Sequence, residues 1–111
     1  MKDFHRQYGL KFVKRGSVRF CDSEEDRNDI LAVNLSTYLS YLQFPDNIIE
    51  EALPEVDKVL NCEPFEDISE ESISVTMTAE KTSLEWYGRT GSLPTKDFKL
   101  ILEEFVEFLL G

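Results

Sequence analysis

Histidine and cysteine are the side chains that most readily act as bases and nucleophiles near neutral pH, and this chain has few of them. His5 is the only histidine, and it lies in an N-terminal stretch that we expect to fray. Cys21 and Cys62 are far apart and belong to no Cys/His spacing typical of a zinc site. Because cysteine is among the most buried residue types, we expect two free thiols, with a disulfide as the alternative.

Carboxylates are abundant, and clustered carboxylates can bind hard cations or cleave glycosides as an acid and base pair. With 22 Asp and Glu residues, adjacent pairs such as Glu24-Glu25 and Glu50-Glu51 are expected from composition alone. The chain contains no phosphate-binding loop, dinucleotide-binding, zinc-protease, nucleophile-elbow or EF-hand motif. We therefore predict no cofactor, no metal and no enzymatic activity, although folding could still bring a cysteine close to His5.

Charge is the strongest global signal, because 22 acidic and 12 basic side chains give a formal net charge of -10. Residues 1–20 are basic, with six Lys or Arg against Asp3, whereas residues 21–80 carry sixteen carboxylates against Arg27 and Lys58. Such a field repels phosphate backbones and anionic membranes and attracts cationic partners. We expect a protein partner, with neither direct nucleic-acid binding nor membrane binding; acidity that only maintains solubility is the alternative.

The acidic segments 22–29 and 63–71 are the candidate contact regions, with solvated surface as the competing interpretation. Two tyrosines are added as anchors, because tyrosine is enriched among residues that dominate interface energies. Tyr41 lies on the outer side of a predicted helix, and Tyr87 points away from the face of Trp86 in a predicted strand. The candidate partner-binding residues are Asp22, Glu24, Glu25, Asp26, Glu63, Glu66, Asp67, Glu70, Glu71, Tyr41 and Tyr87.

The first half of the chain must supply a hairpin and a long helix to position these residues. Alternation over residues 10–20 predicts two short strands around a turn at Arg15-Gly16. Apolar spacings of three and four then predict a helix over residues 24–43, with Ser23 as its N-cap. Pro45 ends that helix.

Two shorter helical pieces are predicted next. Asp46 is the expected cap of the first, and Pro54 suits the first turn of the second, so we predict a break at Pro54, with a kink as the alternative. Residues 61–72 hold many carboxylates and few apolar side chains, so they predict a loop or lid.

The last third of the chain predicts a second hairpin followed by a helix. Strict alternation marks a strand over residues 73–79, and residues 84–87 form its partner, with residues 89–92 ending the hairpin. A helix introduced by Pro94 carries an apolar stripe that includes Phe98, Ile101 and Phe105. The residues expected to face water are Lys99, Glu103, Glu104 and Glu107.

These elements predict an α+β fold over residues 1–111 as a single domain. Two hairpins are unstable alone in water, and each helix has an apolar side that needs cover. An antiparallel sheet made of the two hairpins, packed by the long helix of the N-terminal half and by the C-terminal helix, satisfies both requirements. No apolar run approaches the length that spans a bilayer, and the N-terminus lacks a secretory signal, so we expect a cytoplasmic protein.

Taken as a whole, the chain resembles the immunity proteins of bacterial polymorphic toxins, including those of contact-dependent growth inhibition. The resemblance lies in size, acidity and α+β pattern, and in the segments Asp22-Ser-Glu-Glu-Asp26 and Glu63-Pro-Phe-Glu-Asp67. It implies a cytoplasmic monomer that binds one cognate toxin, a basic nuclease acting on RNA, tRNA or DNA, and covers its active site with an acidic face. The alternative is a small acidic secretion chaperone that binds an effector protein and forms dimers.

Overall fold

The basic N-terminal segment forms a hairpin, as predicted from its alternation. The computed structural model describes residues 3–24, 29–42 and 44–111. After the short 3-10 helix η1 (Phe4–Tyr8), strands β1 (Leu10–Arg15) and β2 (Val18–Ser23) pair antiparallel, with Leu10 opposite Ser23. The turn includes Gly16 at a φ of 61°, a conformation that glycine adopts without a steric penalty.

The first long helix is shorter than predicted. Helix α1 covers Ile30–Tyr41, and the side chain of Asp29 caps it by accepting a hydrogen bond from the backbone N–H of Ala32 at 3.0 Å. The prediction that Ser23 is the N-cap is wrong, because Ser23 is the last residue of β2. Residues 25–28, which the predicted helix included, lie outside the described residues.

The predicted break at Pro54 is also wrong. Helix α2 (Pro45–Asn47), the π-helical segment η2 (Ile48–Ala52) and helix α3 (Leu53–Leu60) follow one another without an intervening loop. Pro54 lies in the first turn of α3, where its missing N–H costs little, and the irregular π-turn precedes it. Asp46 lies in the first turn of α2, and Phe44 occupies the cap position.

The second sheet has three strands, one more than predicted. Strands β3 (Ile73–Met77), β4 (Lys81–Trp86) and β5 (Arg89–Pro94) form an antiparallel meander in the order β3-β4-β5. Residues 89–92, expected to end the hairpin, belong to β5. The α+β class and the antiparallel pairing are confirmed, but the strands form two sheets, one of two strands and one of three.

The C-terminal helix α4 (Thr95–Leu110) follows β5 directly, and its predicted apolar stripe is confirmed. The buried apolar residues of the helix are Phe98, Ile101, Leu102, Phe105 and Val106. The prediction that Glu104 faces water is wrong, because its side chain is buried.

Glu104 is buried because it holds the N-terminal segment, which was expected to fray. Its Oε1 atom accepts the backbone N–H of His5 at 2.8 Å and lies 2.8 Å from Nδ1 of the same residue, while Oε2 accepts the backbone N–H of Phe4 at 2.9 Å. About two turns earlier in α4, Asp97 accepts the Tyr8 hydroxyl at 2.6 Å. The segment η1 is therefore fixed on α4, and His5 is only 5% exposed.

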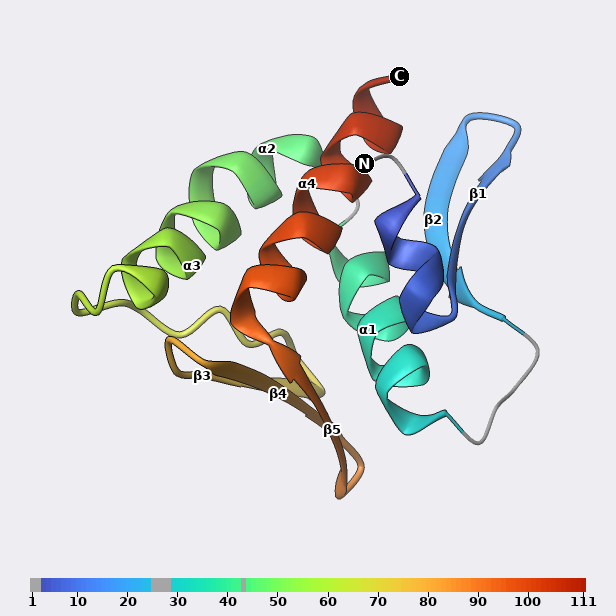
Figure 1. The fold of residues 1–111 in the computed structure, drawn as a ribbon. Coiled ribbons are helices and arrows are strands. Elements are labelled where there is room, and N and C mark those ends of the chain that lie inside the picture. Colours follow the sequence, from blue (N-terminus) through green and yellow to red (C-terminus); the bar gives the residue numbers. More distant parts are fainter. Residues whose placement is uncertain (1–2, 25–28, 43) are drawn as a thin grey trace.

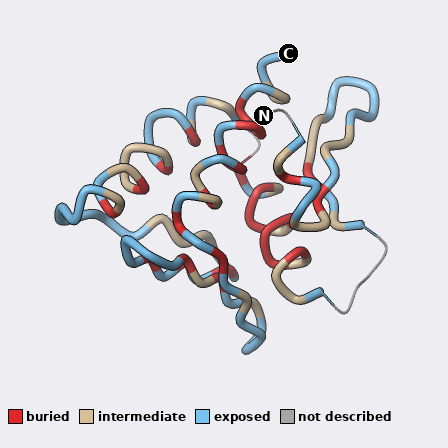
Figure 2. Tube along the Cα trace, in the orientation of Figure 1, coloured by how far each residue is buried: buried red, intermediate tan, exposed pale blue. Residues whose placement is uncertain are grey.

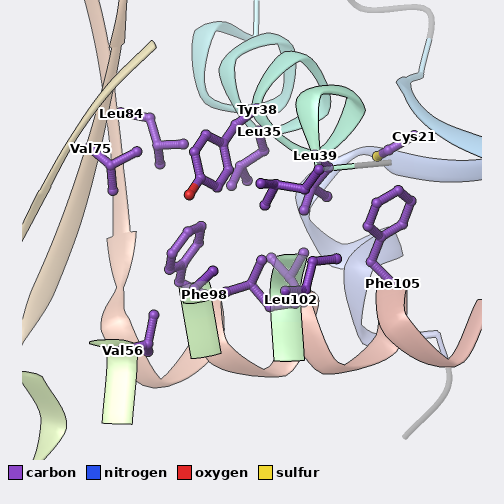
Figure 3. Packing of buried hydrophobic residues seen from close by; sticks show 14 of the residues in the cluster. Cys21, Leu35, Tyr38, Leu39, Val56, Val75, Leu84, Phe98, Leu102 and Phe105 are labelled. Carbon is purple, nitrogen blue, oxygen red and sulfur yellow. The ribbon is translucent and has the colours of Figure 1, made fainter. Parts of the chain in front are cut away.

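Helix α1 lies at the centre of the molecule, between the hairpin β1–β2 and the three-stranded sheet (Figure 1). Buried residues line the sides of α1 and α4 that face the interior (Figure 2). In the core, the Tyr38 ring points toward Phe98, with ring centroids 6.0 Å apart, and Leu84 of β4 lies beside them (Figure 3). Burying a large apolar side chain of this kind contributes about 1.5 to 3 kcal/mol to folding.

Helix α1 is joined to the three-stranded sheet by a polar contact and by a close approach. The buried Asn34 side chain donates through Nδ2 to the carbonyl oxygens of Leu84 and Arg89, at 2.9 Å each. A Cβ atom on Gly91 of β5 would lie 2.7 Å from the Cα of Leu31. Only glycine at position 91 lets the helix and the strand approach this closely.

Candidate functional site

Six carboxylates from two segments surround one hollow beside α3, with a volume of about 340 Å³. Helical spacing places one set along η2 and α3, and the loop 61–72 brings the other set opposite it. We call this feature the acidic hollow. Its carboxylates are Glu50, Glu51, Glu55, Glu66, Asp67 and Glu70.

Tyr38 of α1 supports the loop side of the acidic hollow. Its fully buried side chain donates a hydrogen bond from the hydroxyl to the carbonyl oxygen of Ile68 at 2.7 Å. Burial raises the pKa of Tyr38 far above its ordinary value, and the nearby carboxylates of Glu70 and Asp67 raise it further. The hydroxyl therefore stays protonated and keeps its donor role.

A second contact joins the loop to α3. The backbone N–H of Glu66 donates to Oε1 of Glu55 at 2.7 Å, and Nζ of Lys58 lies 3.1 Å from Oε2 of the same carboxylate. The hydrogen bond from Glu66 lowers the pKa of Glu55, and the hydrogen bond from Lys58 adds to the effect. Glu55 is thus held in its charged form as a bridge between helix and loop.

The far end of the loop is bound to the sheet. Ser69 donates to Oδ1 of Asp67 from its backbone N–H at 3.0 Å and from its hydroxyl at 2.7 Å. The same hydroxyl accepts the backbone N–H of Val75 in β3 at 2.8 Å. Contacts at Glu66, Ile68 and Ser69 therefore hold this loop at three successive places, to α3, to α1 and to β3.

Two neighbouring carboxylates repel the charged form of Glu70, which lines the hollow. The pKa of Glu70 is raised by partial burial first, and then by the charges of Glu51 and Glu71. Among the described residues that line the hollow there is no Lys or Arg. The arrangement is therefore suited to receive a positive charge from outside the chain, which would relieve this repulsion.

The predicted contact residues of the second acidic segment divide between the hollow and its surroundings. Glu66, Asp67 and Glu70 line the hollow, whereas Glu63 and Glu71 are exposed on the same loop and do not line it.

The first acidic segment lies elsewhere. Asp22 and Glu24, at the end of β2, line a different hollow together with Lys11 and Trp86. In Figure 1 the end of β2 and the loop after α3 lie on opposite sides of α1. Over the described residues the two acidic segments thus do not form one face; Glu25 and Asp26 lie outside the described residues.

The two predicted tyrosine anchors also separate. The hydroxyl of Tyr41 lies 2.9 Å from Oγ of Ser72, so this 41% exposed ring is held at the end of the acidic loop. Tyr87 is 82% exposed in the turn between β4 and β5, with a φ of 52°, and it packs edge-on against Trp86. Of the neighbours Trp86 and Tyr87, Tyr87 is the more exposed ring, as predicted. Tyr87 does not line the acidic hollow.

The helical half of the hollow and one aromatic residue were not predicted from the sequence. The pair Glu50-Glu51 was attributed to composition and Glu55 was not considered, although Glu51 and Glu55, four residues apart on a helix, share a face. Phe65 is 42% exposed within the acidic loop, next to Glu66. An aromatic residue between acidic residues of one segment was the available signal for it.

The basic hairpin does not neutralise the acidic hollow in the part of the chain that the structure describes. Arg19 instead donates through Nη1 to the carbonyl oxygens of Phe108, at 2.6 Å, and Leu109, at 3.2 Å. It therefore binds the C-terminal end of α4, where carbonyl groups lack helical partners and the helix dipole favours a cation.

The predicted free thiols are confirmed, with Cys21 buried and Cys62 exposed. Burial raises the pKa of Cys21 strongly, and the charge of Asp22 adds to the shift, so this thiol is a poor nucleophile. No group of three or more His, Cys, Asp or Glu side chains in the described ranges is arranged to hold a metal ion.

No protein-family model, no curated protein and no solved structure matches this chain. None of the helices in the described residues has the length and apolar character needed to cross a bilayer.

Proposed function

We propose that this protein binds a cationic protein partner through the acidic hollow. The observation that carries the proposal is the convergence of six carboxylates from η2, α3 and the loop 61–72 on one concave surface. Lys and Arg side chains form charge-assisted hydrogen bonds with carboxylates, and a concave group of carboxylates can surround one such side chain. The net charge of -10 would speed the approach of a basic partner.

The tethered loop favours tight binding. Its contacts with Glu55, Tyr38 and Val75 hold it in place before a partner arrives, so little conformational entropy remains to be lost on association. Phe65 and Tyr41 add exposed aromatic surface on and beside the loop, where an anchor could pack against apolar surface of the partner.

The partner that best fits this chemistry is a toxin. The resemblance to immunity proteins of polymorphic toxins implies a cytoplasmic monomer that neutralises one cognate toxin. A nuclease that binds the phosphate groups of its nucleic-acid substrate presents Lys and Arg in its active-site cleft. The acidic hollow supplies the opposite charge. In this proposal the loop 61–72 and Glu50, Glu51 and Glu55 enter that cleft and exclude the nucleic acid.

The test compares two triple variants with the same change in net charge. Glu51→Gln, Glu66→Gln and Glu70→Gln remove three charges from the hollow, and none of these side chains forms a hydrogen bond with another described residue. The control replaces three exposed carboxylates outside the hollow and consists of Glu80→Gln, Glu85→Gln and Glu103→Gln.

Each variant is immobilised and used to capture proteins from the native host, and the captured protein is then co-expressed with each variant. The proposal predicts a basic captured protein that stops growth when expressed alone. Wild type and control should bind it one to one and restore growth, whereas the hollow variant should do neither. Equal protection by the hollow variant, or a captured protein without toxicity, would count against the proposal.

A further inference from the structure

The tip of the hairpin β1–β2 is a basic surface that the proposed function does not use. Figure 1 shows the hairpin on one side of the molecule and the loop that follows α3 on the other. Residues 13–20 include Lys14, Arg15 and Arg19 but no Asp or Glu. The tip therefore has the opposite charge from the remainder of this acidic chain.

Two of these three cations have no partner of opposite charge among the described residues. Arg19 binds the carbonyl oxygens at the end of α4, but neither Lys14 nor Arg15 takes part in an ion pair there. The pairing register places Lys14 directly opposite Arg19, and like charges in this position destabilise a pair of strands. A negative charge from outside the chain would offset this repulsion.

The register also gives the hairpin an apolar outer face. Side chains alternate between the two faces of a strand, so the opposed residues Phe12 and Cys21 pack toward the core, whereas Val13 and Phe20 lie on the other face. Val18 shares this outer face and is 54% exposed. In the part of the chain that the structure describes, neither the core nor the residues packed against it include Val13, Val18 or Phe20.

Arg15 and Phe20 form a cation–π contact on the outer face. The guanidinium carbon of Arg15 lies 5.8 Å from the centroid of the Phe20 ring. The contact restricts the Arg15 side chain, whose planar fork of N–H groups matches the geometry of a carboxylate. Val18 lies opposite Arg15 and Val13 lies opposite Phe20, so apolar surface adjoins this fork.

An acidic protein segment fits this surface better than other anionic partners do. Nucleic acids and further copies of this chain carry many negative charges, which the net charge of -10 repels. A bilayer would be approached by the apex of the hairpin, where Gly16 and Ser17 lie rather than apolar side chains. A short acidic segment carries few charges, and its repulsion by distant carboxylates is screened beyond about 8 Å at physiological salt.

We infer that the outer face of the hairpin tip binds an acidic segment of a protein partner. A carboxylate of the segment pairs with Arg15, and a neighbouring apolar side chain packs against Val13 and Val18. None of these three residues lines the acidic hollow, so this second surface is independent of the proposed function.

Three short synthetic peptides of equal length test this assignment by NMR titration of the ¹⁵N-labelled full chain. The first peptide alternates Glu with Phe and Leu, the second has Ser in place of Phe and Leu, and the third has Lys in place of Glu. The first should shift the backbone signals of residues 13–20 saturably, and the other two should bind the hairpin at least about tenfold more weakly. No saturable shift in the hairpin, or equal affinity of the second or third peptide for it, would overturn the inference.

Other occupants are tested with the same labelled protein. It is titrated with duplex DNA and with vesicles that contain phosphatidylserine, and sedimentation of the protein alone measures self-association. DNA and vesicles should bind the hairpin more weakly than the first peptide, and the protein alone should be a monomer. Tighter binding of DNA or vesicles at the hairpin, or a dimer that holds the hairpin in its interface, would overturn the inference.

A matched pair of double variants separates the local surface from the overall charge. Lys14→Gln with Arg15→Gln removes two exposed cations from the tip, and Lys81→Gln with Lys96→Gln removes two exposed cations elsewhere. Affinity for the first peptide should fall at least about tenfold in the hairpin variant and less than about twofold in the control. Equal affinity of the two variants would contradict the inference; if the hairpin variant does not fold, the three peptides decide on wild type alone.

Discussion

Nδ1 of His5 and Oε1 of Glu104 lie 2.8 Å apart, although 99 residues separate them in the chain. The contact joins η1 to α4 and converts an N-terminal segment that should fray into part of the folded core. Glu104 accepts two backbone N–H groups in addition to the imidazole, so one side chain satisfies three donors.

Loss of this carboxylate should destabilise the protein more than loss of its neighbour. Glu104→Ala leaves buried donors of Phe4 and His5 unsatisfied, and we expect a loss of about 3 kcal/mol in the free energy of unfolding. Glu103→Ala, one residue earlier and exposed, should change it by less than about 0.5 kcal/mol. Urea unfolding of both variants measures the difference, and equal effects would contradict the role assigned to Glu104.

The contact between Gly91 and Leu31 predicts a steric effect of one methyl group. A Cβ atom in Gly91→Ala would lie 2.7 Å from the Cα of Leu31, so α1 or β5 must shift. We expect a destabilisation of about 1 to 3 kcal/mol. Thr90→Ala, at an exposed position of the same strand, is the control for urea unfolding; a Gly91→Ala protein as stable as wild type would show that the two elements separate easily.

The sequence predicted elements with strong local periodicity and missed features set by tertiary contacts. The alternation of Ile73, Val75 and Met77 and the stripe of α4 were sufficient to predict β3 and the last helix. In contrast, β5 contains Gly91 and alternates weakly, because close approach of Leu31 fixes its composition more than strand propensity does. Helix propensity likewise could not show that Asp29, rather than Ser23, caps α1.

The candidate site was predicted in part. Glu66, Asp67 and Glu70 were found because they are close together in one polar segment. Glu51 and Glu55 were missed, since their relation to that segment depends on the path of the chain through the loop 61–72. Local sequence identifies residues that could bind a partner, but only the fold shows which of these residues lie together in one site.

Glu70 predicts a conflict between binding and stability. Its pKa is raised in the folded protein, so its charged form is disfavoured by folding, and the protein loses stability as pH rises through that pKa. Glu70→Gln should therefore stabilise the protein at neutral pH, by about 0.5 kcal/mol because solvent screens the charges, and this gain should vanish in acid. Unfolding experiments at neutral and at acidic pH measure this gain in stability. A Glu70→Gln protein that is less stable than wild type at neutral pH would contradict the repulsion of Glu70 by Glu51 and Glu71.

The two thiols should react very differently. Cys62 is exposed, whereas Cys21 is buried with a strongly raised pKa. In the native protein a thiol reagent such as a maleimide should modify Cys62 rapidly, and Cys21 only after unfolding. Cys62→Ser should abolish the rapid phase, and rapid labelling of that variant would show that β2 opens readily in the native state.

The most direct test of the central claim, that the acidic hollow binds a cationic partner, is the association rate of the captured partner at low and at high ionic strength. For wild type and for the control Glu80→Gln, Glu85→Gln, Glu103→Gln, the rate should fall at least about tenfold as salt screens the field. The hollow variant Glu51→Gln, Glu66→Gln, Glu70→Gln should associate slowly even at low salt and show a smaller fall. An association rate that is independent of salt, or equal for the hollow variant and its control, would contradict the claim.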